Sequence, residues 1–305
     1  MFVLDEAVDK LVRAGRIAGE ARDYGASLVK KGASAREVCE EVESYIRRKG
    51  AQPAFPCNFS VNEVAAHYTP GLDDDVRLAG DEVVKVDVGA HIDGYIADTA
   101  VTVDLSGRYG DLLRAVREAL ENVVRIVRPN IRVYDIGRTV EATIKKYKFK
   151  PVRNLTGHTI GRYMIHAGES IPNVPERSMF YKRLRPGTLF AVEPFGTNGR
   201  GYVREEGSAN IYSYTGRRPR TPLTPEESAV LEVIVERFRT LPFTPRWLAG
   251  ELEGKVIVEG LKKLERRGVL VSYPPLVEVE NGIVAQFEHT FLLLKDRVIV
   301  TTKLD

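Results

Sequence analysis

Four carboxylates interrupt apolar runs of this sequence. Asp87 lies in VKVDVGA and Asp98 in YIADTAVTV, while Glu193 and Glu288 lie in LFAVEPF and AQFEHTFLLL. A buried carboxylate is costly unless it is paired or bound to a cation. Each acid alone could face solvent on an edge strand, but the four together favour a shared cation cluster.

The first two acids belong to a predicted β-hairpin over residues 82–105. Alternating and β-branched residues flank Asp93-Gly94, which is a turn signal. If the loop has four residues, His91–Gly94, the pairing places Asp87 directly opposite Asp98. Opposed Cβ atoms lie ~4.5–5.5 Å apart, and like charges there are destabilising unless a cation lies between them. The alternative is that one aspartate faces solvent or caps a turn.

His158 is the candidate fifth ligand. It lies in NLTGHTIG, between Gly157 and Gly161, and glycines let the backbone approach a ligand closely. A lone histidine is more often structural, but beside four unexplained carboxylates it is predicted to bind metal. One imidazole and four carboxylates suit Mn, Fe or Co better than a thiolate-type zinc site. Four acids exceed the needs of one ion, whereas two ions ~3.5–4 Å apart would use them as bridges.

The elements that must position these residues indicate an α+β protein. Apolar periodicity and capping residues, including Ser34 and Glu37 spaced as a capping box, predict helices, and β-branched runs predict strands. The expected helices are 4–31, 34–49, 111–127 and 135–147, and the expected strands beyond the hairpin are 188–194, 284–294 and 297–302.

Residues 215–272 differ from the rest of the chain. They open with the Pro- and Arg-rich GRRPRTPLTP, and helical patterns follow at 225–239 and 255–267. The segment holds 11 Lys or Arg and 8 Asp or Glu, a net charge of +3. We interpret it as a small helical subdomain inserted into one catalytic domain formed by 1–214 and 273–305.

Composition narrows the class of protein. With 43% hydrophobic and 29% charged residues the chain is globular, and a net charge of +3 argues neither for nor against nucleic acid. Cys39 and Cys57 form no zinc spacing, the acidic start MFVLDEAVDKL is unlike a signal peptide, and no apolar run approaches ~20 residues. These features predict a cytoplasmic protein. Glutamine occurs only twice, a bias typical of hyperthermophile proteins.

Five motifs together resemble methionine aminopeptidases, specifically type 2, in which an insertion such as 215–272 lies between the two glutamates. The resemblance covers essentially the whole chain and implies the pita-bread fold, a curved antiparallel sheet flanked by paired helices, with a winged-helix-like insertion. The motifs are AAHYTP (65–70), KVDVGAHIDGYIADTA (85–100), NLTGHTIGRYMIHAGESIPN (154–173), AVEPFGTNGRG (191–201) and YPPLVEVENGIVAQFEHT (273–290).

The resemblance also assigns roles to the ligands. It implies two divalent ions (Co, Mn, Fe or Zn), one held by Asp87 and the other by His158 and Glu193, with Asp98 and Glu288 bridging both. The ions would activate a water molecule as nucleophile.

Further roles follow from the same resemblance. His166 would hydrogen-bond the scissile peptide, His67 would contact the substrate backbone and the leaving amide, and Glu193 could shuttle protons. Three residues match positions near the methionine pocket, although ordinary core packing explains them equally well: Phe55, Ile165 and Tyr273.

The implied function is co-translational removal of the N-terminal methionine before small second residues. The expected partners are nascent polypeptide N-termini and, transiently, the ribosome, with neither a membrane nor a stable nucleic-acid partner. The chain begins without the long charged extension of eukaryotic type 2 enzymes, and in this it resembles the archaeal forms. This weakens the case for docking to the ribosome through such an extension. Two alternatives remain: an X-Pro dipeptidase or aminopeptidase P, and a non-catalytic nucleic-acid-binding relative, suggested by GLKKLERRGVL at 260–270.

Overall fold

The computed structural model describes residues 2–219 and 221–304. None of the helices in these ranges combines the length and the hydropathy that a membrane span requires. The helices are α1 (Phe2–Leu28), α2 (Ala35–Arg48), α3 (Gly110–Ile126), α4 (Val133–Lys146), η1 (Arg177–Met179), α5 (Pro225–Arg237), η2 (Pro245–Leu248) and α6 (Gly254–Arg266).

The strands are mostly short, apart from one long hairpin. They are β1 (Gln52–Pro53), β2 (Asn58–Val61), β3 (Val64–Ala66), β4 (Val83–Ile92), β5 (Tyr95–Asp104), β6 (Lys150–Pro151), β7 (Thr156–His158), β8 (Ser170–Pro172), β9 (Leu189–Val192), β10 (Phe195–Thr197), β11 (Val203–Glu205), β12 (Tyr212–Tyr214), β13 (Leu270–Ser272), β14 (Leu276–Glu278), β15 (Val284–Gln286), β16 (His289–Leu293) and β17 (Val298–Val300).

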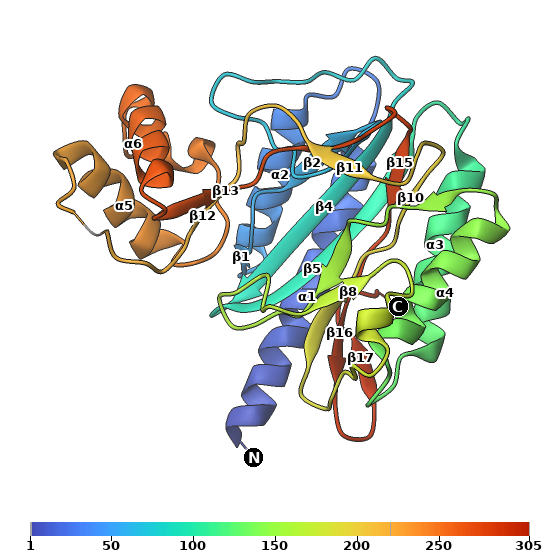
Figure 1. Ribbon diagram of the computed structural model, residues 1–305. Helices are drawn as coiled ribbons and strands as arrows, with labels where there is room; N and C mark the ends of the chain where they lie inside the picture. Colours follow the sequence, from blue (N-terminus) through green and yellow to red (C-terminus); the bar gives the residue numbers. More distant parts are fainter. Residues whose placement is uncertain (1, 220, 305) are drawn as a thin grey trace.

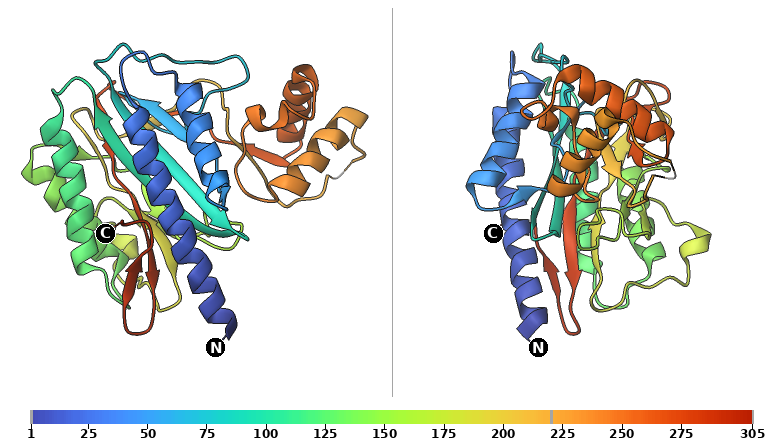
Figure 2. Two further views of the ribbon diagram at one scale, coloured as in Figure 1. Left: turned by 180° about the vertical axis from the view of Figure 1, so that it is seen from behind. Right: turned by 90° about the vertical axis from the view of Figure 1, so that its left-hand side faces the viewer.

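Two pairs of helices cover one face of an antiparallel sheet. Helix α1 packs on β4 and β5 beside α2, whereas α3 packs on β10 and β15 beside α4. Viewed from behind, these helices lie in front of the strands (Figures 1 and 2). The arrangement confirms the expected α+β class and the pita-bread fold. It leaves the opposite face of the sheet free to carry a site.

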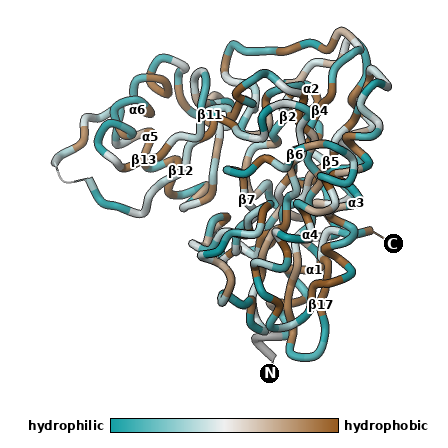
Figure 3. The backbone as a smooth tube through the Cα atoms, turned by 45° about the vertical axis from the view of Figure 1, so that its right-hand side comes forward, coloured by the Kyte–Doolittle hydropathy of each residue, from teal (hydrophilic) through white to brown (hydrophobic). Residues whose placement is uncertain are grey.

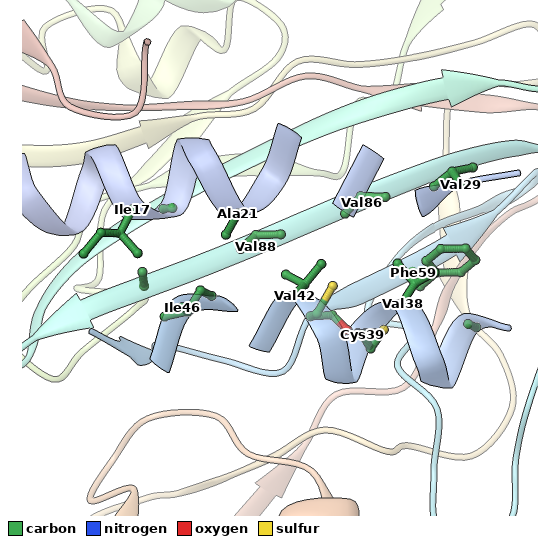
Figure 4. Packing of buried hydrophobic residues seen from close by; sticks show 14 of the residues in the cluster. Ile17, Ala21, Val29, Val38, Cys39, Val42, Ile46, Phe59, Val86 and Val88 are labelled. Carbon is green, nitrogen blue, oxygen red and sulfur yellow. Dashed lines mark hydrogen bonds between the residues drawn. The ribbon is translucent and has the colours of Figure 1, made fainter. Parts of the chain in front are cut away.

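Apolar side chains at helical spacing bind the first helix pair to the sheet. Val38, Val42 and Ile46 of α2 are buried against Val86 and Val88 of β4 (Figure 4). Hydropathy along the backbone follows this layering, with apolar stretches where helices meet strands and polar stretches in many outer loops (Figure 3). The packing fixes β4, and with it Asp87, on a rigid base.

The start of α2 differs in detail from the predicted capping box. Ser34 is the N-cap and its hydroxyl accepts a hydrogen bond from the backbone N–H of Glu37. The Glu37 carboxylate does not complete the box; it lies 3.6 Å from Arg77 instead. The Ser34 hydroxyl donates in turn to Asp75. The cap therefore also ties α2 to the loop before β4.

The hairpin has a different register from the predicted one. Ile92 pairs with Tyr95, so the loop is the two-residue Asp93-Gly94, with φ of 51° and 82°. Two positive φ values are typical of a type I′ turn, whose twist suits a tight hairpin. The prediction that Asp87 opposes Asp98 is therefore wrong: Asp87 pairs with Ala100 and Asp98 with Gly89. The predicted register is shifted by two residues, and side chains alternate with a period of two. Both aspartates therefore still lie on one face.

The two glutamates lie where strands are interrupted. The predicted continuous strands 188–194 and 284–294 are each shorter or broken: β9 ends at Val192, and Phe287 and Glu288 separate β15 from β16. Pro194 has no backbone N–H to donate to the ladder, and its carbonyl accepts from Phe287 N–H at 3.3 Å. Such irregularities redirect side chains near functional sites.

Residues 215–272 enclose a hydrophobic cluster of their own. Helices α5 and α6 project to one side of the sheet (Figure 1). Val230, Ile234, Phe243, Leu248 and Ile257 are among its fully buried members. Strands β12 and β13 pair where the chain enters and leaves this segment, and they form its base. The two predicted helices are confirmed, with ends at Arg237 and Arg266.

Candidate metal centre and catalytic pocket

A cavity of about 360 Å³ opens on the face of the sheet away from α1–α4, since none of its lining residues comes from these helices. All the residues predicted to form a site meet there. They are Phe55, His67, Asp87, Asp98, His158, Ile165, His166, Glu193, Tyr273 and Glu288.

Three of the predicted metal ligands, Asp87, Asp98 and His158, lie on strands β4, β5 and β7, and the two glutamates reach the same point from the strand breaks. Ligand atoms of Asp98, His158 and Glu288 all lie within 4.8 Å of one another. The His158 Nε2 atom is 3.5 Å from Asp98 Oδ2 and 3.6 Å from Glu193 Oε1. Asp87 joins the group from β4. The cluster thus combines residues from across the chain.

Gln286 is a site residue that the sequence analysis did not single out. Its Nε2 atom lies 3.4 Å from Asp87 Oδ2 and donates to Glu288 Oε2 at 3.2 Å. The side chain is 1% exposed. A signal existed, because Gln286 is one of only two glutamines in the chain. The amide orients two carboxylates whose mutual repulsion would otherwise separate them.

Threonines fix the backbone behind the cluster. The Thr290 hydroxyl donates to the Asp98 carbonyl at 2.7 Å and accepts from its N–H at 2.8 Å. The Thr99 hydroxyl donates to the Glu288 carbonyl at 2.8 Å, and Arg22 donates to Thr99. Strand β5, which carries Asp98, is therefore joined directly to the segment of Glu288 and Thr290.

The protein groups alone oppose ionisation of these carboxyls. Burial raises the pKa of Asp98 to about 7. Burial, reinforced by the Asp98 charge, raises the pKa values of Asp87, Glu193 and Glu288 well above their usual range. Burial lowers the pKa of His158 to about 4, so the ring is neutral at pH 7. Removing charges from water without compensation produces shifts of this direction.

The donor set fits divalent metal ions. Within the described residues, buried atoms of four ligand candidates have no hydrogen-bond partner: Asp87 Oδ1, Asp98 Oδ1, Glu288 Oε1 and His158 Nδ1. Buried polar atoms are normally paired, and such exceptions require a cause. Carboxylates with one neutral imidazole are ligands that Mn, Fe, Co and Zn accept. Cations at this point would supply partners for the three carboxylate oxygens, and His158 faces the same point through Nε2.

Two further histidines stand beside the cluster. The rings of His158 and His166 meet edge to face at 4.4 Å, and the His67 ring is 5.7 Å from that of Tyr273. Burial lowers the pKa of His67 to about 4 and that of His166 to about 3. At neutral pH both imidazoles are uncharged and can donate a hydrogen bond from one nitrogen.

The apolar end of the cavity depends on close packing between β4 and Phe55. A Cβ atom on Gly89 would lie 2.2 Å from the Phe55 ring. Phe55, Ile165 and Leu241 belong to one buried cluster. Because Gly89 has no side chain, the Phe55 ring can lie against β4 at the position that pairs with Asp98.

Comparison with known protein families relates this chain to metallopeptidases. The model of metallopeptidase family M24 matches residues 9–293. The methionine aminopeptidase of Pyrococcus abyssi is 46% identical over 296 residues, covering 97% of this chain and 99% of the relative. That of Methanocaldococcus jannaschii is 43% identical over 298 residues, covering 98% and 99%.

Solved structures extend the likeness to the fold. A thermophilic Arx1 superimposes with a TM-score of 0.86 at 19% identity, covering 98% of this chain and 92% of the other. The methionine aminopeptidase of Thermotoga maritima gives 0.70 at 22% identity, covering 98% and 97%. The prolidase of Pyrococcus furiosus gives 0.62 at 16% identity, covering 98% of this chain and 64% of that chain. At these identities the likeness concerns the fold alone.

Proposed function

The chain belongs to metallopeptidase family M24, and from that premise we propose that it removes the N-terminal methionine from nascent polypeptides. The observation that carries the proposal is the convergence of four carboxylates, two buried and two half-buried, with His158 beside two neutral histidines. The high identity to methionine aminopeptidases over 97% of the chain supports this substrate over other N-termini.

A metallopeptidase needs divalent cations, and charge balance supports two of them. Ionised together, the four carboxylates carry four negative charges, which two divalent ions would neutralise while His158 stays neutral. Asp87 would hold one ion, His158 and Glu193 the other, and Asp98 and Glu288 would bridge. When bound, the ions would lower the pKa of a water molecule to about 7 and polarise the scissile carbonyl. Cobalt, manganese, iron and zinc all suit these ligands.

The remaining groups orient the peptide and handle protons. Neutral His166, whose ring packs against His158, would donate a hydrogen bond to the scissile peptide. Neutral His67 would contact the substrate backbone and the leaving amide. Glu193, whose Oε1 atom lies 3.6 Å from His158 Nε2, could in addition shuttle a proton during the reaction.

The apolar end of the cavity would bind the methionine side chain. Phe55, Ile165 and Tyr273 supply aromatic and aliphatic surface next to the carboxylate cluster. Apolar burial at one end and convergent polar groups at the other would select an unbranched apolar first residue. Small second residues are expected to be preferred.

The domain division and the partners belong to the same proposal. The separate hydrophobic cluster and the β12–β13 base support a subdomain at 215–272 inserted in a catalytic domain of 1–214 and 273–305, as in type 2 enzymes. Nascent chains would be the substrates. A transient ribosome association would bring the protein to them, without a stable nucleic-acid partner.

Hydrolysis of three peptides tests the proposal. Met-Ala-Ser should be cleaved after chelated protein is reloaded with Mn²⁺ or Co²⁺, whereas Leu-Ala-Ser and Ala-Pro should not. Cleavage of Ala-Pro in preference to Met-Ala-Ser would instead assign an X-Pro dipeptidase. No hydrolysis, together with retention of labelled RNA at 0.15 M salt, would favour the non-catalytic relative.

A further inference from the structure

The loop that carries His67 has a backbone conformation that must be held in place. His67 follows β3 directly and has φ of +66°, in the left-handed region that residues with a Cβ atom rarely adopt. Such conformations persist at functional sites only when surrounding contacts determine them. The next three residues show which contacts do so.

Each residue after His67 is fixed by a different part of the chain. The Tyr68 carbonyl accepts from the N–H of Phe59 at 2.8 Å. Asn210 Nδ2 donates to the Thr69 carbonyl at 3.1 Å. Arg246 donates from Nε to the Pro70 carbonyl at 2.8 Å and from Nη2 to Thr69 Oγ1 at 3.3 Å. Arg246 is the only one of these partners that binds two consecutive loop residues through its side chain.

Arg246 is itself fixed by a buried ion pair with α2. Its Nη2 atom lies 3.0 Å from Glu43 Oε1 and its Nη1 atom 3.4 Å from Oε2. The two side chains are 4% and 2% exposed. Trp247 Nε1 donates to the same carboxylate at 2.7 Å, and Cys57 N–H at 3.3 Å. A planar guanidinium with several donors can satisfy the carboxylate and the loop at once.

This ion pair joins parts of the chain that lie far apart in the sequence. Arg246 and Trp247 belong to η2, inside 215–272, and are about 200 residues from Glu43 in sequence. Arg246 binds Thr69 and Pro70, which follow His67 by two and three residues. The inserted segment therefore contacts the loop that carries His67.

We propose that Arg246, held by Glu43, is a positioning residue for His67, so that the inserted segment takes part in catalysis through this loop. Loss of the bidentate contact would let the loop relax from the positive φ and move the His67 ring away from the leaving amide. The inference rests on the role proposed above for His67.

The test is a double-mutant cycle with Met-Ala-Ser as substrate. Arg246→Lys keeps the charge but cannot bond Glu43, Thr69 and Pro70 together. It should lower kcat about 10- to 100-fold, as small displacements of positioned groups do, with KM and metal content near those of the wild type. In a His67→Ala background the same change should lower kcat by less than about two-fold, because coupled residues are not additive.

Arg267→Lys is the matched control. Arg267 also binds a buried glutamate, Glu227 at 2.9 Å, together with a threonine hydroxyl and the Pro222 carbonyl, but it lies wholly within the inserted segment. Its conversion to lysine should leave kcat unchanged. If Arg246→Lys does not fold at the assay temperature, Glu43→Gln replaces it, with the same expected dependence on His67.

The outcomes separate the inference from its premise. Wild-type kcat in His67→Ala would overturn the role of His67 and the inference with it. A large loss in His67→Ala without a loss in Arg246→Lys would overturn the inference alone. So would losses that multiply in the double variant, because these would mark Arg246 as a general structural support.

Discussion

Removing the metals should make the protein less stable as the pH rises, and the Asp98 carboxyl sets the size of the effect. Burial raises its pKa from 3.8 to about 7. Between these values the folded, metal-free chain keeps a proton that the unfolded chain releases, so the free energy of unfolding falls with increasing pH. The full difference corresponds to about 4 kcal/mol, at about 1.4 kcal/mol per pH unit.

The part accessible to experiment lies between pH 5 and pH 7.5 and amounts to about 2–3 kcal/mol. With an unfolding entropy of about 2.1 cal/mol/K per residue, the 305-residue chain should lose about 4 °C in Tm over this range. The pKa values of Asp87, Glu193 and Glu288 are raised in the same direction and add to the loss. Bound metal should oppose the trend, because the ions bind the deprotonated carboxylates.

Calorimetry of chelated wild type and chelated Asp98→Asn measures the effect against a matched control. The variant lacks the titrating group, so the Tm of the variant minus the Tm of the wild type should increase as the pH rises. Surface ion pairs are common to both proteins and cancel in the comparison. Identical pH dependence of the two Tm values would refute the argument that buried carboxyls strain the metal-free fold.

Four further substitutions address separate parts of the pocket. His158→Ala should lower metal content, whereas His67→Ala should keep the metal and lose about 10²–10⁴ in kcat, measured by elemental analysis and methionine release; the reverse pattern would exchange their roles. Tyr273→Ala should raise KM for Met-Ala-Ser more than it lowers kcat, because a pocket wall acts mainly through uniform binding, and an unchanged KM would make Tyr273 a packing residue. Gly89→Ala should displace Phe55, whose ring lies 2.2 Å from the added Cβ, and raise KM with the metal content unchanged; an unaltered KM would place the methionine elsewhere.

The sequence predicted which residues meet in one cavity better than it predicted the detailed strand pairing. Side chains alternate along a strand, so Asp87 and Asp98 share a face whether the hairpin loop has two residues or four. The four-residue loop was wrong because Asp93-Gly94 alone accommodates both positive φ values. The apolar flanks of the acids were enough to predict burial, and burial was enough to predict a cation cluster.

Contacts between distant segments could not be predicted in this way. Pattern analysis of single segments treats residues 284–294 as one strand, but at the break Phe287 bonds to Pro194, where the chain between β9 and β10 is also interrupted. The pair of Glu43 and Arg246 joins residues that no local period relates. Such contacts form only when complete helices and strands pack together, and local sequence patterns do not reveal which distant elements will meet.

Metal content measured together with methionine release tests the central claim most directly. Glu288 is assigned to bridge two ions, and glutamine at this position is a weaker, uncharged ligand. Wild-type protein should bind two ions and release methionine from Met-Ala-Ser, whereas Glu288→Gln should bind fewer than two and release none. Near-wild-type rates in Glu288→Gln with two bound ions would contradict the assignment of this carboxylate cluster as the catalytic metal centre.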